Sequence, residues 1–305
     1  MSVARSLVLG VTNNKVISSF ANKHGLELGA KRFVAGETLE TAIENVKILN
    51  SKGIIATLDH LGESILSLDR AAGAADEYIK TLEGIAQSKI NSNVSLKLTQ
   101  MGLDIDDNFC CSNVERIVSK ARQLNNFVRI DMEDHGHLAA TISIFKRLKE
   151  NYPDNVGLVL QSYLYRTVAD MKELSYLKAN YRFVKGAYKE PKDVAYPNKE
   201  DVDDNLKNII EQHLLEGNYA AIASHDEAII DHTIRFTNGH NIPRSLFEFQ
   251  MLFGISTNLQ EKLAQDGYTV RCYVPYGKDW YPYFTRRLAE RPANVMFILK
   301  NYFKH

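Results

Sequence analysis

A short stretch near the end of the chain places anion-binding groups on one side of a helix. In the run YFTRRLAE at residues 283–290, the positions i, i+3, i+4 and i+7 hold Tyr283, Arg286, Arg287 and Glu290. With about 3.6 residues per helical turn, these side chains share one face. Adjacent guanidinium groups can each form paired hydrogen bonds with a planar carboxylate, so the stretch predicts a carboxylate-binding face. The alternative is a solvated helix in which both arginines pair with Glu290, each pair contributing roughly 0.2–0.5 kcal/mol.

The composition excludes several other kinds of site. Lys plus Arg and Asp plus Glu both number 37 and the pI is about 7.1, so no overall field favours nucleic acid. The absence of a signal-peptide pattern and of a run of about 18 apolar residues predicts a soluble, intracellular protein. Cys110, Cys111 and Cys272 lack the spacing of a disulfide framework or a zinc site. Neither G-x-G-x-x-G nor a Walker A motif is present, so any cofactor must be held by other means.

Eight short apolar segments rich in β-branched residues predict strands. They cover residues 54–58, 94–98, 127–130, 156–160, 182–184, 219–223, 246–249 and 269–273. Amphipathic segments between them, at residues 112–124, 137–149, 201–216 and 260–266, predict helices. Repeated strand–helix units form parallel sheets, and eight of them predict a (β/α)8 barrel. Helical patterns at residues 18–24 and 38–49 predict extra N-terminal helices, so we expect residues 1–51 to pack on a barrel of residues 52–305.

A polar residue stands at or just after the end of each predicted strand. These residues are Asp59, Lys97, Asp131, Gln161, Lys185, His225, Gln250 and Tyr273. Active sites of barrel enzymes lie at the C-terminal ends of the strands, so these side chains are expected to converge there. The alternative is that each one only opens a polar loop. The helix with the arginine pair follows the last strand, which would bring it to the same cavity as Lys97 and predicts an anionic substrate.

Eight motifs span nearly the whole chain. They are RFVAGET at 32–38, SLKLT at 95–99, RIDME at 129–133, QSYL at 161–164, RFVKGAY at 182–188, ASHD at 223–226, YVPYG at 273–277 and YFTRRLAERPAN at 283–294. Together, and in this order, they resemble the motifs of the proline dehydrogenase family in its monofunctional bacterial form. The resemblance implies a distorted (β/α)8 barrel that holds FAD non-covalently. It also implies oxidation of L-proline to (S)-1-pyrroline-5-carboxylate by hydride transfer from the ring carbon to flavin N5, the first step of proline degradation to glutamate.

The resemblance implies a substrate site made of five residues. Carried over, the substrate carboxylate pairs with Lys97, Arg286 and Arg287. Two guanidinium groups and an ammonium suit one carboxylate and would aim the ring carbon next to the nitrogen at the flavin. Tyr273 and Tyr283 would pack around the ring. Family members that favour hydroxyproline tend to carry a smaller residue at the position of Tyr273, so we expect proline.

The remaining residues are implied around the chemistry and the cofactor. The catalytic set is Asp131, Arg182 and Tyr273: Arg182 lies by flavin N5, where a cation favours the reduced ring, and Asp131 pairs with Lys97 and orients it. The implied cofactor contacts are Met132, Gln161, Arg182, Lys185, Gly186, Ala187, Lys199, Ser224, His225 and Glu290. Lys185 and Lys199 are the candidates for the diphosphate and the adenosine end.

Two other interpretations stay open at this point. The run DMEDHGH at residues 131–137 crowds carboxylates and histidines, as in barrel hydrolases that bind zinc. In that interpretation Asp131, His135 and His137 bind the metal, and Lys97 or Asp226 assists a water. A barrel that binds flavin or an amino acid without turnover, as a sensor, is the second.

The resemblance also implies partners. Electrons would pass to a membrane quinone, so we expect a cytoplasmic protein with weak peripheral association at the inner face of the membrane. The sequence leaves open whether a pyrroline-5-carboxylate dehydrogenase docks to receive the product, and it leaves the oligomeric state open.

Overall fold

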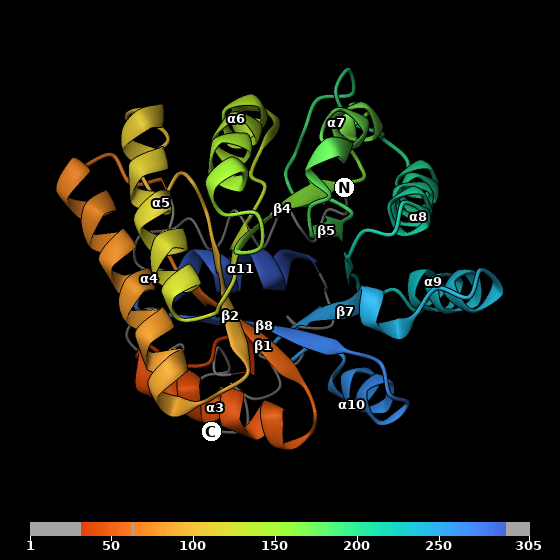
Figure 1. The fold of residues 1–305 in the computed structure, drawn as a ribbon, viewed down its shortest axis with the longest axis horizontal. Coiled ribbons are helices and arrows are strands. Elements are labelled where there is room, and N and C mark those ends of the chain that lie inside the picture. Colours follow the sequence, from red (N-terminus) through yellow and green to blue (C-terminus); the bar gives the residue numbers. More distant parts are fainter. Residues whose placement is uncertain (1–31, 63, 291–305) are drawn as a thin grey trace.

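Eight parallel strands form a closed barrel in which each strand pairs with the next and β8 pairs with β1 (Figure 1). The computed structural model describes residues 32–62 and 64–290, with the side chains of the last helix described as far as Arg287. The strands are β1 (Ile55–His60), β2 (Ser92–Leu96), β3 (Val128–Ile130), β4 (Val156–Gln161), β5 (Tyr181–Val184), β6 (Ala220–Ala223), β7 (Phe247–Leu252) and β8 (Val270–Tyr276). All eight predicted strands are confirmed, with ends shifted by a few residues, and so is the (β/α)8 fold.

Helices alternate with the strands and surround the barrel (Figure 1). They are α3 (Leu39–Ser51), α4 (Leu68–Ser88), α5 (Asp107–Gln123), α6 (His135–Asn151), α7 (Thr167–Glu173), α8 (Lys199–Leu215), α9 (Glu227–Gly239), α10 (Thr257–Gln265) and α11 (Trp280–Glu290), with 3-10 turns η2 (Ser175–Leu177) and η3 (Arg244–Leu246). The four helices predicted between strands are confirmed. In the described ranges no helix has both the length and the apolar character needed to cross a bilayer.

Helix α3 confirms the helix predicted at residues 38–49. It begins with a capping box in which Thr38 accepts a hydrogen bond from the backbone of Thr41, and Thr41 accepts one in return. The other N-terminal helix, predicted at residues 18–24, lies outside the described residues. The proposed division of the chain at residue 51 therefore stays a prediction.

The side chains of the strands fall into two alternating sets. Apolar residues such as Phe183, Phe249 and Val274 belong to the buried core shared with the helices. Neighbouring side chains in a strand point to opposite faces, so the residues between them point into the barrel. Barrel interiors are usually filled by branched apolar side chains, but here they include Arg182 and Gln250, which hydrogen bond across the barrel at 2.5 Å. The interior is therefore built from polar contacts that must satisfy one another.

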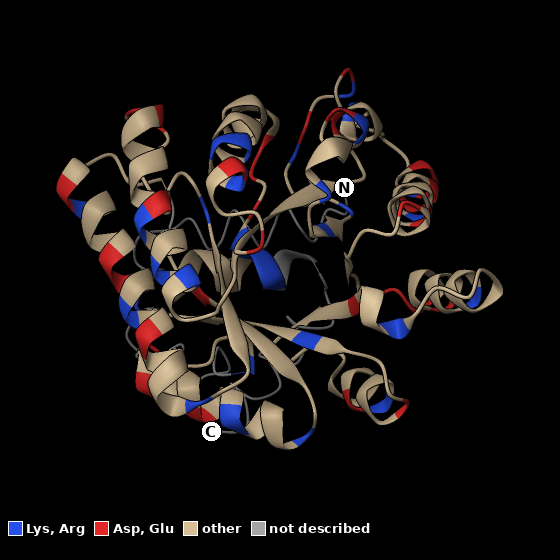
Figure 2. Cartoon of the chain, viewed as in Figure 1, with Lys and Arg blue, Asp and Glu red and all other residues tan. Residues whose placement is uncertain are grey.

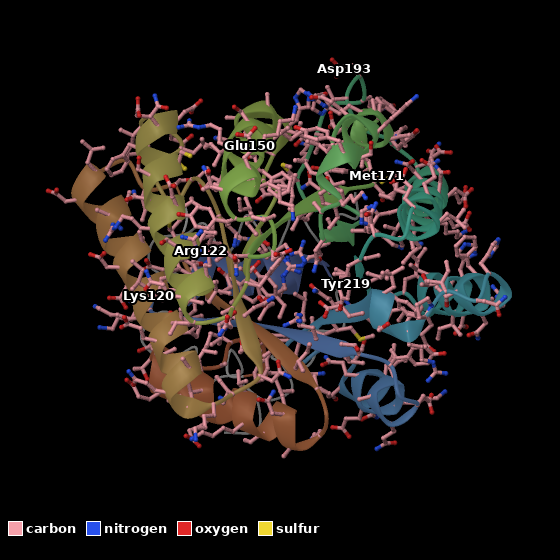
Figure 3. The ribbon with its side chains drawn as sticks, in the orientation of Figure 1. Lys120, Arg122, Glu150, Met171, Asp193 and Tyr219 are labelled. Carbon is pink, nitrogen blue, oxygen red and sulfur yellow. The ribbon has the colours of Figure 1, made fainter. Side chains whose placement is uncertain are left out.

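A buried ion pair occupies the layer of the interior near the N-terminal ends of β7 and β8, which we call the lower layer. Arg271 donates from Nε and Nη2 to the two oxygens of Glu248, at 2.7 and 3.0 Å. Tyr219, labelled in Figure 3 just before β6, donates to Glu248 at 2.9 Å. Gln250 donates to the same carboxylate and, through its carbonyl oxygen, accepts from Arg182. The Glu248–Arg271 pair thus helps to hold Arg182 in position through Gln250.

Breaking this pair should be costly. Arg271→Met leaves the carboxylate of Glu248 buried without its cation, so we expect a loss of about 3–5 kcal/mol in the free energy of unfolding, measured by chemical denaturation. Lys47→Met is the matched control, because its pair with Glu44 is exposed and should contribute less than about 1 kcal/mol. Equal losses in the two variants would contradict the assigned role.

Candidate active site

Four side chains from the C-terminal ends of separate strands meet inside the mouth of the barrel. The phenol oxygen of Tyr273, on β8, lies 2.7 Å from Asp59 Oδ2 and 2.8 Å from Asp131 Oδ2. Lys97 Nζ lies 3.3 Å from the same oxygen of Asp59 and 3.8 Å from that of Asp131. Two carboxylates, an ammonium and a phenol thereby come together, as the strand-end pattern predicted, although β8 continues to Tyr276 and Tyr273 lies in its middle.

Asp131 is the more tightly held of the two carboxylates. Its Oδ1 atom accepts from Arg182 Nη1 and from Ser95 Oγ, both at 2.6 Å. Burial raises the pKa of a carboxyl group, but here the charges of Arg182 and Lys97 outweigh it and lower the pKa of Asp131 below its usual value. Asp131 is therefore ionised at neutral pH.

Tyr273 stays protonated in these surroundings. Burial and the charges of Asp131 and Asp59 raise the pKa of Tyr273 well above its usual value. Arg182 also lies over its ring, with Cζ 5.3 Å from the centroid. The phenol can thus donate one hydrogen bond to a carboxylate of the cluster, and this bond together with Arg182 fixes the orientation of the tyrosine ring.

Asp59 is the residue that the sequence analysis left out of the proposed site. It was noted only as a polar strand end, yet it is 1% exposed and contacts both Lys97 and Tyr273. Tyr78, fully buried on α4, donates to its other oxygen at 3.1 Å. Its place after an apolar strand, in line with Lys97 and Asp131, was the signal that could have identified it.

Helix α11 lies at the same end of the barrel. Trp280, Tyr283 and Phe284 pack with Leu61, which directly follows β1. Arg286 helps to line a hollow of about 400 Å3 together with Leu61 and other residues of this region. Arg287 lies over the ring of Tyr283, with Cζ 5.3 Å from the centroid. In Figure 2 the basic stretch of α11 lies near the middle of the ring of helices.

A wider hollow, of about 710 Å3, lies at the opposite end of the barrel. It is lined by the segments that precede β2, β3 and β4, among them Asn91, Asn126 and Asn155. Active sites of barrel enzymes lie at the C-terminal ends of the strands, and that end also holds the charged cluster. We therefore assign the active site to the mouth and not to the larger hollow.

One side of the mouth has features that suit a flat cofactor. Gln161 donates to the backbone carbonyls of Met132 and Glu133, and its Oε1 atom is buried with no partner in the part of the chain that the structure describes. A buried acceptor without a partner fits a site in which a ligand supplies the donor. Gly186 adopts φ of +111°, and a Cβ there would lie 2.2 Å from the ring of Tyr163, so only glycine fits this close approach.

The two lysines expected at the diphosphate share a pair of carboxylates: Lys185 directly follows β5, and Lys199 is the first residue of α8. Lys185 contacts Asp203 and Asp226 at 2.5 and 2.7 Å, and Lys199 contacts the same two carboxylates. The hydrogen bond from Lys185 lowers the pKa of Asp226 to about 2. The ion pairs fix the positions of both lysines and balance their charges. Their role at a diphosphate stays a prediction.

The other expected cofactor contacts lie nearby. Ala187 is exposed in the loop after β5. Ser224 Oγ accepts from the backbone of Asp226 at 3.1 Å, and His225 Nε2 accepts from the backbone of Leu252 at 3.0 Å. The second contact places the ring proton of neutral His225 on Nδ1. The side chain of Glu290 lies outside the described residues.

The contacts of His137 disfavour the hydrolase interpretation. Its ring nitrogens lie 2.7 Å from Asp134 and 2.8 Å from Asp104, at the N-terminus of α6, so neither nitrogen is directed at Asp131. Within residues 32–62 and 64–290, no three His, Cys, Asp or Glu side chains form a group that could hold a metal. His137 instead ties the loop after β2 to α6.

This histidine should make stability depend on pH. Burial lowers the pKa of His137, but the hydrogen bonds to Asp104 and Asp134 outweigh it and raise the pKa above its usual value of about 6.5. A raised folded-state pKa stabilises the protein fully below the unfolded-state pKa, and the effect fades as pH rises through the folded-state value. His137→Gln should therefore lower the denaturation midpoint most in acid and least in alkali. The exposed His240→Gln is the control, and a loss independent of pH would rule this account out.

Comparison with known proteins identifies the family. The family model described as proline dehydrogenase matches residues 42–300. Proline dehydrogenase 1 of Bacillus subtilis is 46% identical over 300 residues, which cover 98% of this chain and 99% of that protein. Proline dehydrogenase of Deinococcus radiodurans is 44% identical over 304 residues, which cover 98% of each chain.

A solved structure supports the fold. It is proline utilization A (PutA) from Bdellovibrio bacteriovorus, inactivated by N-propargylglycine, with a TM-score of 0.82 and 24% sequence identity. The match covers 90% of this chain and 34% of that one. At this level of identity the comparison establishes the shared barrel.

Proposed function

Because this chain belongs to the proline dehydrogenase family, we propose that it oxidises L-proline to (S)-1-pyrroline-5-carboxylate with bound FAD and passes the electrons to a quinone. The observation that carries the proposal is the cluster of Lys97, Asp131, Arg182 and Tyr273 at the mouth, beneath a helix with two adjacent arginines. The charges of this cluster suit an amino acid with one carboxylate and one ammonium group.

Arg286, Arg287 and Lys97 are proposed to bind the substrate carboxylate. The stacking of Arg287 on Tyr283 restricts the guanidinium, and Asp59 restricts Lys97. Because these groups are held before the substrate arrives, less conformational entropy is lost on binding. Fixing the carboxylate also fixes the ring, so the carbon next to the nitrogen can be aimed at the cofactor.

FAD, when bound, supplies the acceptor of the hydride. Gln161 and Met132 are proposed to lie near its ring, and Gly186 and Ala187 along its chain, with Lys185 and Lys199 as the candidate partners of its phosphates. Ser224, His225 and Glu290 complete the proposed set. The unpartnered Oε1 of Gln161 supports this placement.

Arg182 is proposed to hold a positive charge beside the reacting part of the cofactor. Its guanidinium is anchored on three sides, by Asp131 at 2.6 Å, Ser95 at 3.1 Å and Gln250 at 2.5 Å. A cation fixed in this way favours added negative charge without reorganisation. Asp131 anchors Arg182 and pairs with Lys97, which keeps both groups in place for the reaction.

The acceptor and the next enzyme extend the proposal. A quinone in the bilayer implies weak peripheral contact of this chain with the inner face of a membrane. The product is the first intermediate between proline and glutamate, so a pyrroline-5-carboxylate dehydrogenase is the candidate partner.

Removing either arginine should weaken substrate binding. Arg286→Ala or Arg287→Ala removes a charged hydrogen bond of about 1.5–3 kcal/mol, so kcat/KM for L-proline should fall roughly 10- to 150-fold, mainly through KM. Arg235→Ala is the control, since Arg235 is exposed on α9. Unchanged steady-state kinetics in both α11 variants would contradict the binding role and favour the alternative of a solvated helix face.

The cofactor and the acceptor can be tested in one experiment. The purified protein should show the visible absorption of an oxidised flavin, and L-proline added without oxygen should bleach it. A soluble quinone analogue added afterwards should restore the absorption. A protein without flavin, or a flavin that proline cannot reduce, would refute the proposed function, whereas bleaching that no quinone reverses would refute only the acceptor.

A further inference from the structure

The phenol of Tyr273 has one proton but two carboxylate neighbours. Asp59 Oδ2 and Asp131 Oδ2 lie 2.7 and 2.8 Å from its oxygen, and both distances are those of hydrogen bonds. A single O–H group can donate to only one of them. The other contact places two oxygen atoms at hydrogen-bond distance with no proton between them. The cluster is therefore suited to take up one more proton, on one of the two carboxylates.

The two carboxylates differ in how firmly they are held as anions. Asp131 accepts at 2.6 Å from the cation Arg182 and at 2.6 Å from Ser95. Asp59 accepts from the neutral phenol of Tyr78 at 3.1 Å and from Lys97 at 3.3 Å. Shorter, charged hydrogen bonds stabilise an anion more strongly. An incoming proton should thus settle on Asp59 while Asp131 stays paired with Arg182.

The proposed reaction requires such an acceptor. At neutral pH the ring nitrogen of proline carries two hydrogens and a positive charge. Hydride loss from the neighbouring carbon needs the lone pair of that nitrogen, so one N–H proton must leave first. A positioned acid–base group typically contributes roughly 10²–10⁴-fold to such a step.

We propose, resting on the proposed function, that Asp59 takes up the amine proton through Tyr273. The N–H proton of the amine passes to the phenol oxygen of Tyr273 while the phenolic proton passes to Asp59 Oδ2. The amine then holds its lone pair, Tyr273 keeps one proton and Asp59 becomes a neutral carboxylic acid. No further oxidant or reductant takes part, and Asp59 acts through Tyr273 without touching the substrate.

The described groups around Asp59 come from five elements. They are His60 next to it on β1, Lys97 after β2 with Gln100 in the loop beyond, Asp131 after β3, Tyr78 on α4, and Tyr273 and Tyr276 on β8. Moving the proton from the ammonium of the substrate to Asp59 replaces a buried ion pair with two neutral groups. In a site of low polarity this change is less costly than it would be in water.

The decisive variant is Asp59→Asn, which keeps the size of the side chain but cannot accept the proton. In single-turnover flavin reduction at neutral pH we expect a loss of at least about 100-fold. The variant can use only proline that is already neutral in solution. Its rate should thus rise about tenfold per pH unit towards the pKa of the free amine, whereas the wild-type rate should stay constant over the same range.

A binding measurement separates this role from a structural one. The cyclic ether tetrahydrofuran-2-carboxylate keeps the carboxylate and replaces the amine by oxygen, so it needs no proton acceptor. Asp59→Asn also removes a partner of Lys97, so the dissociation constant of the ether, measured by titration, should rise by less than about tenfold and by the same factor at every pH, far less than the loss of rate at neutral pH.

Several results would overturn the relay. They are a wild-type rate and profile in Asp59→Asn, a slow rate that alkali does not recover, or weakened binding of the ether in parallel with the rate. If Asp59→Asn does not fold, Tyr273→Phe breaks the same relay and should show the same alkaline recovery. Failure of proline to reduce the wild-type flavin would instead refute the proposed function.

Discussion

The pairing of charges inside the barrel is the constraint on which the rest of the structure depends. Burying a charge without a partner costs several kcal/mol, so each ionised group in the interior needs a partner in place. Glu248 is matched by Arg271 in the lower layer, and Asp131 by Arg182 in the upper layer. Gln250 joins the two layers by hydrogen bonds to both. These pairs therefore favour the strand register that aligns the partners.

The same contacts set the chemical state of the upper layer. Arg182 and Lys97 keep Asp131 ionised, and the two carboxylates around Tyr273 keep its phenol protonated. Asp59 connects this cluster to α4 through Tyr78, outside the strands. A substitution of Glu248 or Arg271 should consequently alter the position of Arg182 at the mouth, because Gln250 bonds to both Glu248 and Arg182. The interior serves as the support of the site as well as the core of the fold.

Much of this architecture could be predicted from the sequence, because each strand is a short apolar run that a polar residue ends. Periodicity and spacing predicted the eight strands, and the strand-end rule predicted that Lys97, Asp131 and Tyr273 converge. Which strand ends touch depends on register and side-chain length, and this could not be read from the chain. Asp59 was therefore left out of the predicted site, although it lies closer to Lys97 than Asp131 does. His137 was considered as a metal ligand because sequence proximity to Asp131 does not reveal that its ring is held by Asp104.

The charge balance of the interior explains why an amino acid suits this mouth. The charged residues described on the interior of the strands and at their ends include four cations, Lys97, Arg129, Arg182 and Arg271, and three carboxylates, Asp59, Asp131 and Glu248. Arg129 is bonded to the carbonyl oxygens of Leu158 and Asn180, and burial together with the nearby Arg182 lowers its pKa to about 9, so it stays charged at neutral pH. In the proposed function, Arg286 and Arg287 on α11 add two guanidinium groups that suit a carboxylate. A simple carboxylic acid could pair with these groups but would leave Asp59 and Tyr273 without a proton to accept. Under the proposed function, a cyclic amino acid would supply both the anion for the arginines and the acidic N–H for the carboxylates.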